Sequence, residues 1–336
     1  MIGHKNISAF FHQISSSDSI VIIPHKDPDG DAIGSSLAWN DVLKAQGYSV
    51  SVVCPNEITQ TLSWMKGFDD IVIYKTQMEK AKEILENAKY FIFLDFNNLT
   101  RIGALHDELI KLNAPRLVMD HHPSPQENIA DVLVSDTTVS STCELSFTVL
   151  RVLGWPISLD AAECLYTGIM TDTGLLNHNS SRPEIYHIVA ELIGKGVDKE
   201  KIHNKIFQSN SLSRTRLFGH ALCNKLEILP SQKVGLITLT LKELKEFDYK
   251  LGDTEGLVNE PLSIKGVEVA ALFTEKEDNI VRISFRSIGD IAVNKYSEQY
   301  FNGGGHKNAA GGKFKGSLSA AVEVFKSTVE SYFYKE

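Results

Sequence analysis

The sequence predicts an α/β protein with a parallel-sheet N-terminal domain, a helical linker and a smaller α/β C-terminal domain. In the N-terminal half, short and nearly continuous apolar runs alternate with segments of helical periodicity. This alternation is typical of a parallel sheet covered by helices on both faces. After Gly174 the pattern becomes mostly helical, and from residue 233 onward strands dominate. We therefore expect three parts: residues 1–185, 186–228 and 229–336.

The elements of the N-terminal part follow from these patterns in chain order. Apolar runs predict strands at 19–24, 48–54, 69–74, 89–95 and 115–120. Helical spacing predicts helices at 7–14, 30–47, 77–88, 101–112, 141–154 and 158–174. Gly47 is expected to end the second helix, because glycine readily takes the left-handed conformation found just after helix C-termini.

The rest of the chain changes character twice. Helices are expected at 183–196, 198–208 and 212–229, strands at 233–241, 267–275 and 279–287, and helices at 292–301 and 317–334. A glycine-rich segment, "NGGGHKNAAGG" at 302–312, lies between the last two helices. Three successive glycines would let backbone amides approach an anion closely. The alternative is a tight structural turn. Arg286 in "SFRS" could clamp a phosphate through two parallel hydrogen bonds.

Composition excludes several classes of protein. With 43% hydrophobic and 23% charged residues, the chain resembles an ordinary globular protein. Its four cysteines form no CxxC pair, which argues against a zinc knuckle or disulfide framework and fits the cytoplasm. We find neither a secretory signal nor an apolar run of the roughly 18 residues that a membrane span needs. The net charge of −8 argues against coating of long nucleic acid.

Acidic and histidine side chains gather where predicted strands end. The first strand runs into "HKDPDGD", and two later strands end at Asp95 and at "DHH", whereas Asp172 follows a predicted helix. The carboxyl ends of parallel strands share one edge of the sheet, where ligands bind. The residues expected to converge there are His25, Asp29, Asp31, Asp95, Asp120, His121, His122 and Asp172. Each alone has an ordinary explanation as a turn or helix cap.

Convergence of so many carboxylates requires compensation. Buried unpaired charges cost several kcal/mol each, and cations are sparse in these segments. Protonation and pairing with Lys or Arg are alternatives, but divalent metal ions resolve the repulsion most simply. Carboxylates mixed with imidazoles suit Mn²⁺, and Mg²⁺ less selectively. Six ligands are too many for one open site but fit two ions that share a carboxylate, the arrangement used for in-line phosphoryl displacement.

Taken together, these motifs resemble those of a known family. "HKDPDGDAIGSS", "FLDFNN", "MDHHPS" and "TGIMTDTG", followed by "GGGHKNAAGG", resemble the DHH phosphoesterase superfamily with its DHH-associated second domain. Within it, the layout is most similar to that of two-domain oligoribonucleases (nano-RNases) and pAp phosphatases. The resemblance implies a catalytic metal-binding domain at 1–185, a substrate-binding domain at 229–336 and an active site in the cleft between them.

The resemblance also implies individual roles. His25 and Asp29 would bind one metal, Asp31 and His121 the other, with Asp95 and Asp172 shared. Asp120 would orient a neighbouring imidazole, and His122 would face the substrate phosphate and stabilise charge or protonate the leaving oxygen. The residues implied to hold substrate from the second domain are Arg286, Gly303, Gly304, Gly305 and His306. His178, shortly after Asp172, receives no role.

The predicted function is a two-metal phosphoesterase with Mn²⁺, or alternatively Mg²⁺ or Co²⁺. It would hydrolyse short oligoribonucleotides from an end and 3′-phosphoadenosine 5′-phosphate (pAp), and the acidic charge favours short substrates over long duplexes. Whether the chain forms a homodimer is left open. The alternatives are a phosphodiesterase for cyclic-di-AMP or pApA, an exopolyphosphatase and, in a different class, an inactive nucleotide-binding regulator. The presence of all six metal ligands weighs against the last of these.

Overall fold

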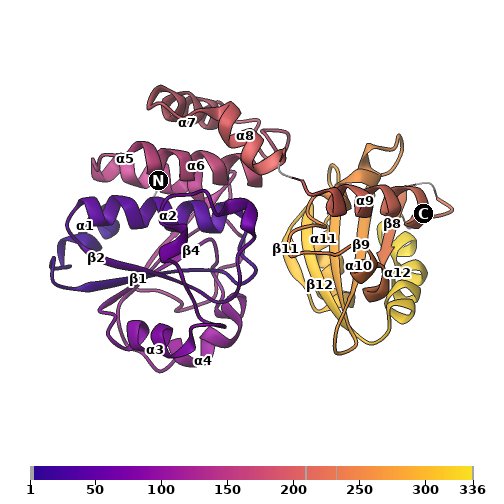
Figure 1. The fold of residues 1–336 in the computed structure, drawn as a ribbon, viewed down its shortest axis with the longest axis horizontal. Coiled ribbons are helices and arrows are strands. Elements are labelled where there is room, and N and C mark those ends of the chain that lie inside the picture. Colours follow the sequence, from indigo (N-terminus) through magenta and orange to yellow (C-terminus); the bar gives the residue numbers. More distant parts are fainter. Residues whose placement is uncertain (1–3, 209, 232, 335–336) are drawn as a thin grey trace. The chain divides into compact units, whose positions relative to one another are not determined.

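The structure, a computed structural model, describes residues 4–208, 210–231 and 233–334. It consists of two compact units, Met1–Ser209 and Asn210–Glu336, each built around its own six-stranded sheet (Figure 1). Within these described ranges, no helix is both long enough and apolar enough to cross a membrane. The functional boundaries expected at residues 185 and 228 stay a prediction.

The first unit contains a fully parallel sheet, as the sequence predicts. Its strand order is β3-β2-β1-β4-β5-β6, with every neighbouring pair parallel. The strands are β1 (Ser19–Pro24), β2 (Ser49–Cys54), β3 (Val72–Ile73), β4 (Tyr90–Leu94), β5 (Arg116–Asp120) and β6 (Val132–Ser135). Strand β6 was not predicted, because this half-exposed edge strand has an apolar run of only three residues, 132–134.

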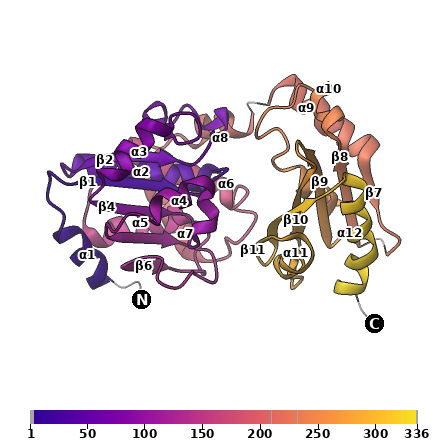
Figure 2. The ribbon, with the colours of Figure 1, turned by 90° about the horizontal axis from the view of Figure 1, so that it is seen from below.

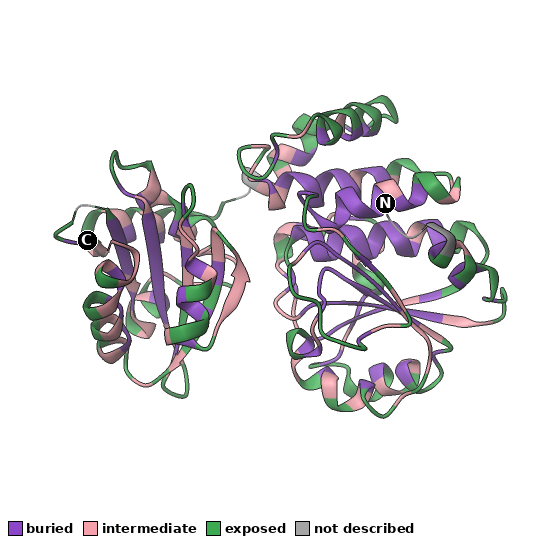
Figure 3. Ribbon diagram, turned by 180° about the vertical axis from the view of Figure 1, so that it is seen from behind, coloured by how far each residue is buried: buried purple, intermediate pink, exposed green. Residues whose placement is uncertain are grey.

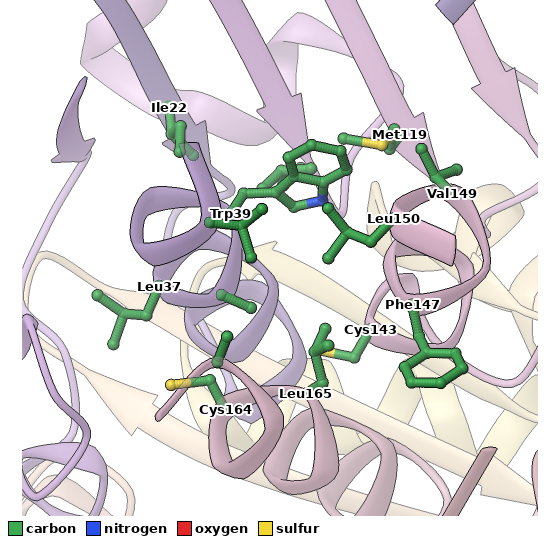
Figure 4. Close-up of a cluster of buried hydrophobic side chains, with 14 of the residues drawn as sticks. Ile22, Leu37, Trp39, Met119, Cys143, Phe147, Val149, Leu150, Cys164 and Leu165 are labelled. Atoms are coloured by element: carbon green, nitrogen blue, oxygen red, sulfur yellow. The ribbon is translucent and has the colours of Figure 1, made fainter. Parts of the chain in front are cut away.

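Helices cover both faces of this sheet, and each face has its own hydrophobic core. One face carries α1 (His4–His12), α2 (Gly30–Ala45), α5 (Thr142–Leu153) and α6 (Leu159–Asp172), and the other carries α3 (Met78–Glu86) and α4 (His106–Leu109) (Figure 1). The larger core lies under the first group and includes Trp39, Met119, Phe147 and Leu150 (Figure 4). Burial of these side chains fixes α2 and α5 against the strand ends.

Helices α2 and α6 pack unusually closely because glycines line their contact. A Cβ atom on Gly30 would lie 2.3 Å from Thr171 Oγ1, and one on Gly168 would lie 2.8 Å from Asp31 Oδ1. The beginning of α2 therefore lies against the end of α6. Figure 3 shows both helices mostly buried. This contact brings Asp172, the last residue of α6, to the same edge of the sheet as the first residues of α2.

One helical prediction in this unit needs correction, and further helices complete it. The segment predicted as one helix at 101–112 forms η3 (Leu99–Leu105), a 3₁₀ helix broken at Gly103, and then the short α4. A φ of 58° at Gly103 interrupts the helical path. Two further short 3₁₀ helices are η1 (Gln60–Leu62) and η2 (Phe68–Asp70), and α7 (Pro183–Gly194) and α8 (Lys199–Phe207) complete the unit.

The second unit has a mixed sheet of order β11-β12-β10-β9-β8-β7, in which only β8 and β9 pair in parallel among the described strands. Its strands are β7 (Leu226–Ile228), β8 (Val234–Leu239), β9 (Val269–Lys276), β10 (Ile280–Ser287), β11 (Gly304–His306) and β12 (Ala309–Lys315). The predicted helix at 212–229 is too long: it ends as α9 (Leu212–His220) and a π-helical turn, η4 (Ala221–Lys225), before β7.

Helices cover this second sheet from both sides. One core joins the sheet to α11 (Val293–Phe301) and α12 (Leu318–Phe333), and another joins it to α9, α10 (Leu241–Glu246) and η5 (Leu257–Ser263) (Figure 2). The glycine-rich segment is not a loop: it forms the antiparallel hairpin β11–β12. Two glycines admit no side chain here, because a Cβ on Gly303 would lie 2.0 Å from Gly311 O and one on Gly305 2.6 Å from Ala309 O.

Candidate metal centre

The candidate site lies at the carboxyl edge of the first sheet, at its topological switch point. β1 and β4 are neighbours there although the chain leaves β1 toward β2, and such a crevice is where open α/β sheets bind ligands. His25 follows β1 directly and Asp95 follows β4 directly. Asp95 takes a φ of 65°, a left-handed conformation uncommon outside glycine, asparagine and aspartate. Backbone strain of this kind is concentrated at functional sites.

Asp95 lies among three imidazoles. Its Oδ2 is 3.2 Å from His25 Nε2, and its Oδ1 is 3.4 Å from His121 Nε2 and 3.8 Å from His122 Nδ1. The Asp95 side chain is only 2% exposed. Three sets of potential ligand atoms, each lying within 4.8 Å, include this carboxylate. Two of them consist of predicted metal ligands, one with His25 and Asp29 and the other with Asp31 and His121, and the third contains Asp120 and His122.

Asp29, Asp31 and Asp172 complete the cluster. Asp29 Oδ1 caps α2 by accepting from the backbone amides of Asp31 and Ala32, while its Oδ2 is 3.9 Å from His25 Nε2. His121 Nε2 is 3.6 Å from Asp172 Oδ2 and 3.9 Å from Asp31 Oδ2. The structure thus brings all six predicted metal-binding side chains together, including Asp172, which the sequence placed after a helix rather than at a strand end.

Burial and crowding shift the proton affinities of this cluster. Burial raises the pKa of Asp172 to about 7, and burial together with the charge of Asp95 raises the pKa of Asp31 well above its usual range. Burial opposes charge on His121, but the hydrogen bond to Asp95 and the charge of Asp172 raise its pKa to about 10. Burial likewise opposes charge on Asp95, yet hydrogen bonds from His121 and His25 hold its pKa well below normal. These raised pKa values mean that bound protons offset the negative charge of the carboxylates in this cluster.

These residues fit a pair of divalent cations. Two imidazoles and four carboxylates form a mixed nitrogen–oxygen donor set, which suits manganese and related ions. The pKa of His121, which its acidic neighbours raise against the opposing effect of burial, shows that the cluster attracts positive charge strongly. Metal ions would supply that charge in place of protons. Asp95, whose two oxygens face His25 and His121 separately, would be the carboxylate that both ions share.

Asp120 and His122 form a separate pair beside the cluster. Asp120 is fully buried and accepts from the His122 backbone amide at 3.0 Å, and its Oδ1 lies 2.7 Å from His122 Nδ1. An ionised carboxylate only accepts hydrogen bonds, so Nδ1 carries a proton and donates to Asp120. This bond fixes the orientation of the His122 ring, as carboxylates commonly do for functional imidazoles.

Two features near the cluster were not predicted from the sequence to lie there, the start of α5 and the charge of Arg101. The amides of Thr142 and Cys143, at the start of α5, donate to Asp31, and the Thr142 hydroxyl donates to Asp95. Burial disfavours charge on His25, but the hydrogen bond to Asp95 and the charges of Asp29 and Asp95 raise its pKa overall, and the charge of Arg101 opposes them only weakly. The helix-capping pattern "STCE" was readable in the sequence, but nothing local indicates that this helix begins at the cluster.

The predicted substrate-binding residues lie together on the second sheet. Arg286 on β10 and His306 on β11 both pair with Ala309 of β12, one from each side. Directly paired residues point to the same face, so the guanidinium and the imidazole flank a small alanine. Both are half-buried. Gly303, Gly304 and Gly305 lead into this row, and their role in holding a ligand stays a prediction. His178 contacts Gly174 and is not among the grouped potential ligands in the described residues.

Comparison with known proteins gives a consistent picture. The model of the DHH family, N-terminal domain, matches residues 19–169, and that of the DHHA1 domain matches residues 233–335. A solved exopolyphosphatase-related protein from Bacteroides fragilis is 40% identical, with a TM-score of 0.91, coverage of 98% of this chain and of 96% of its own.

Two curated relatives carry functional names. The bifunctional oligoribonuclease and PAP phosphatase NrnA of Bacillus subtilis is 27% identical over 303 residues, covering 89% of this chain and 90% of that protein. The cyclic-di-AMP phosphodiesterase GdpP of the same organism is 24% identical over 332 residues, covering 95% of this chain but 49% of that protein. These relatives differ in substrate, so similarity alone does not choose among substrates.

Proposed function

Because this chain belongs to the DHH family and is a phosphoesterase, we propose that it hydrolyses short oligoribonucleotides from an end and removes a phosphate from pAp. The observation that carries the proposal is the buried Asp95 carboxylate, which two sets of predicted metal ligands share. The name of the Bacillus subtilis relative, which matches along 90% of its own length, supports the substrate choice. The net charge of −8 favours short substrates, since long nucleic acids require extended basic tracks.

The proposed metal centre would use six side chains. His25 and Asp29 would hold one ion, His121 and Asp31 the other, and Asp95 and Asp172 would be shared. Mn²⁺ is the proposed ion, with Mg²⁺ and Co²⁺ as alternatives, because imidazoles in a carboxylate site favour transition ions. Bound divalent ions would lower the pKa of the attacking water and stabilise negative charge on the phosphoryl oxygens.

His122 would protonate the leaving oxygen. The bond from Nδ1 to Asp120 leaves Nε2 as the ring atom that would protonate the departing oxygen. The neighbouring carboxylate stabilises the charged imidazolium from which this proton comes, as buried carboxylates do in other acid–base pairs. In the second unit, Arg286 and His306 would bind the substrate's terminal phosphate or nucleotide, with the glycines of β11 allowing close approach.

A substrate panel tests this proposal. Phosphate release from pAp and shortening of labelled di- to pentanucleotides are measured with Mn²⁺ and with EDTA, beside cyclic-di-AMP, pApA and polyphosphate at equal concentration. We expect pAp and the short oligonucleotides to be cleaved fastest, and all cleavage to stop in EDTA. Faster turnover of cyclic-di-AMP, pApA or polyphosphate would replace the proposed substrate. Binding of nucleotides without any turnover would instead indicate a regulator.

A further inference from the structure

We infer that Thr142 is a positioning residue for the metal centre, because its hydroxyl fixes the carboxylate that both ions would share. The hydroxyl donates to Asp95 Oδ1 at 2.8 Å across a sequence separation of 47 residues. Both side chains are buried, Thr142 completely. The inference rests on the proposed two-metal centre, but it concerns a residue that supplies no ligand atom itself.

This hydrogen bond runs from the Thr142 hydroxyl to the Asp95 carboxylate, whose oxygens act as acceptors. Oδ1 is also the oxygen nearest His121 Nε2, at 3.4 Å. The hydroxyl thus restricts rotation of the carboxylate on the side where His121 and Asp31 gather.

The contact is not a by-product of helix formation. Other buried or half-buried threonines in this unit, such as Thr148 and Thr167, turn their hydroxyls to a carbonyl of their own helix four residues earlier. Thr142 is the first residue of α5, so its helix offers no such carbonyl. Its hydroxyl instead reaches a residue at the end of a different strand, β4.

The first turn of α5 holds Thr142 in a fixed position for this contact. Ser141 caps the helix by accepting from the Glu144 amide at 3.0 Å. The amides of Thr142 and Cys143 then donate to Asp31 at 2.6 and 2.8 Å, so one turn restrains two of the acidic side chains. The Cys143 side chain belongs to the main core, where Phe147 and Leu150 of the same helix also lie (Figure 4).

An ion pair of the buried Glu144 with the half-buried Arg182 holds the same turn in place. Glu144 is 1% exposed and accepts from both the amide and the hydroxyl of Ser140 at 2.7 Å. Its other oxygen pairs with Arg182, which precedes α7. Because the loop before α5 is tied down in this way, Thr142 has little freedom to follow Asp95. Groups that orient metal ligands from outside typically change metal affinity by roughly 10–100-fold when removed.

The test compares three variants by Mn²⁺ titration calorimetry of the whole chain without substrate. Thr142→Val replaces the hydroxyl by a methyl group of similar size, and Thr142→Ser keeps it. Thr167→Val is the matched control, because Thr167 is equally buried and its hydroxyl bonds only within its own helix among the described contacts. We expect roughly 10–100-fold weaker Mn²⁺ binding in Thr142→Val, near-normal binding in Thr142→Ser, and no change in the control.

Several outcomes would overturn the inference. Unchanged affinity in Thr142→Val would do so, and so would an equal loss in Thr142→Ser, because the hydroxyl would then not be the cause. If circular dichroism shows that Thr142→Val is unfolded, Thr142→Ala replaces it, and the same two criteria apply. Wild-type protein that takes up no Mn²⁺ would remove the metal centre itself, whereas wild-type uptake with an unaffected Thr142→Val would remove only the role of Thr142.

Discussion

The two units of this chain present their candidate functional residues in contrasting ways. In the first unit, charged side chains collect at the end of a parallel sheet, and the central ones, Asp95 and His121, are only 2% exposed. In the second, Arg286 and His306 stand half-buried on one face of antiparallel strands, with alanine between them. Strand ends concentrate charge from distant parts of the chain, whereas a strand face spreads it in a row.

This difference suggests a division of labour. Buried, mutually restrained carboxylates hold their positions accurately, which suits chemistry that is the same for every substrate. Half-buried side chains on a sheet face can adapt to different ligands. We therefore expect changes in the first unit to affect turnover of all substrates equally, and changes in the second to affect substrate binding. The following predictions test that division, from the largest effect to the smallest.

Replacement of Asp95 should have the largest effect. Asp95→Asn removes a charge that both sets of metal ligands share, and loss of metal-ion catalysis worth several kcal/mol corresponds to a fall in turnover of roughly 10³-fold. The fall should be similar for pAp and for dinucleotides, measured at saturating substrate. Asp107→Asn is the control, since that side chain is 80% exposed in the same unit. A loss confined to one substrate would break the proposed division.

Metal binding should stabilise the first unit specifically. All three tryptophans, Trp39, Trp64 and Trp155, lie in this unit, so their fluorescence reports its unfolding alone. Mn²⁺ at 100 times its dissociation constant should add about 2.7 kcal/mol, which raises the melting temperature by roughly 5–10 °C. Metal ligands must lose their protons, and the pKa of Asp172 is about 7, so the shift should grow from pH 6 to pH 8. An equal shift in Asp95→Asn would show binding elsewhere.

Replacement of Arg286 should act on binding rather than turnover. A hydrogen-bonded charged contact contributes about 1.5–3 kcal/mol, so Arg286→Gln should raise KM by roughly 10–150-fold with little change in kcat. Arg216→Gln, an exposed arginine of α9, is the matched control and should leave KM unchanged. A selective fall in kcat in Arg286→Gln would place this residue in the chemical step instead.

Two glycines of the second unit should respond differently to replacement by alanine. Gly303→Ala forces a Cβ atom against a backbone carbonyl and should cost about 1–3 kcal/mol in urea unfolding followed by circular dichroism. Gly304→Ala meets no atom within 4 Å and should change stability by less than about 0.5 kcal/mol. Equal stability of both variants would contradict the close packing of this hairpin.

The sequence predicted the parts of the fold that depend on local pattern. Apolar runs followed by His25, Asp95 and Asp120 specify buried parallel strands, and parallel strands bring their carboxyl ends to one edge. The position of Asp172 could not be derived in this way. It depends on the glycine-mediated contact between α2 and α6, which is a tertiary feature.

Other features were hidden for related reasons. The β11–β12 hairpin lacks the β-branched residues that indicate strands, and it forms because β12 pairs with β10 from Ala309 to Lys315. Thr142 carries a local helix-start signal, but the identity of its partner, Asp95, depends on where the helix begins relative to β4. Contacts between segments distant in sequence are therefore the part that required the structure.

The number of Mn²⁺ ions bound per chain tests the central claim most directly. Protein stripped with EDTA is dialysed against Mn²⁺, and bound metal is measured by elemental analysis for the wild type and for Asp95→Asn. A shared Asp95 carboxylate predicts two ions per wild-type chain and loss of at least one in the variant. Absence of bound Mn²⁺ in the wild type, or two ions retained in Asp95→Asn, would contradict the account.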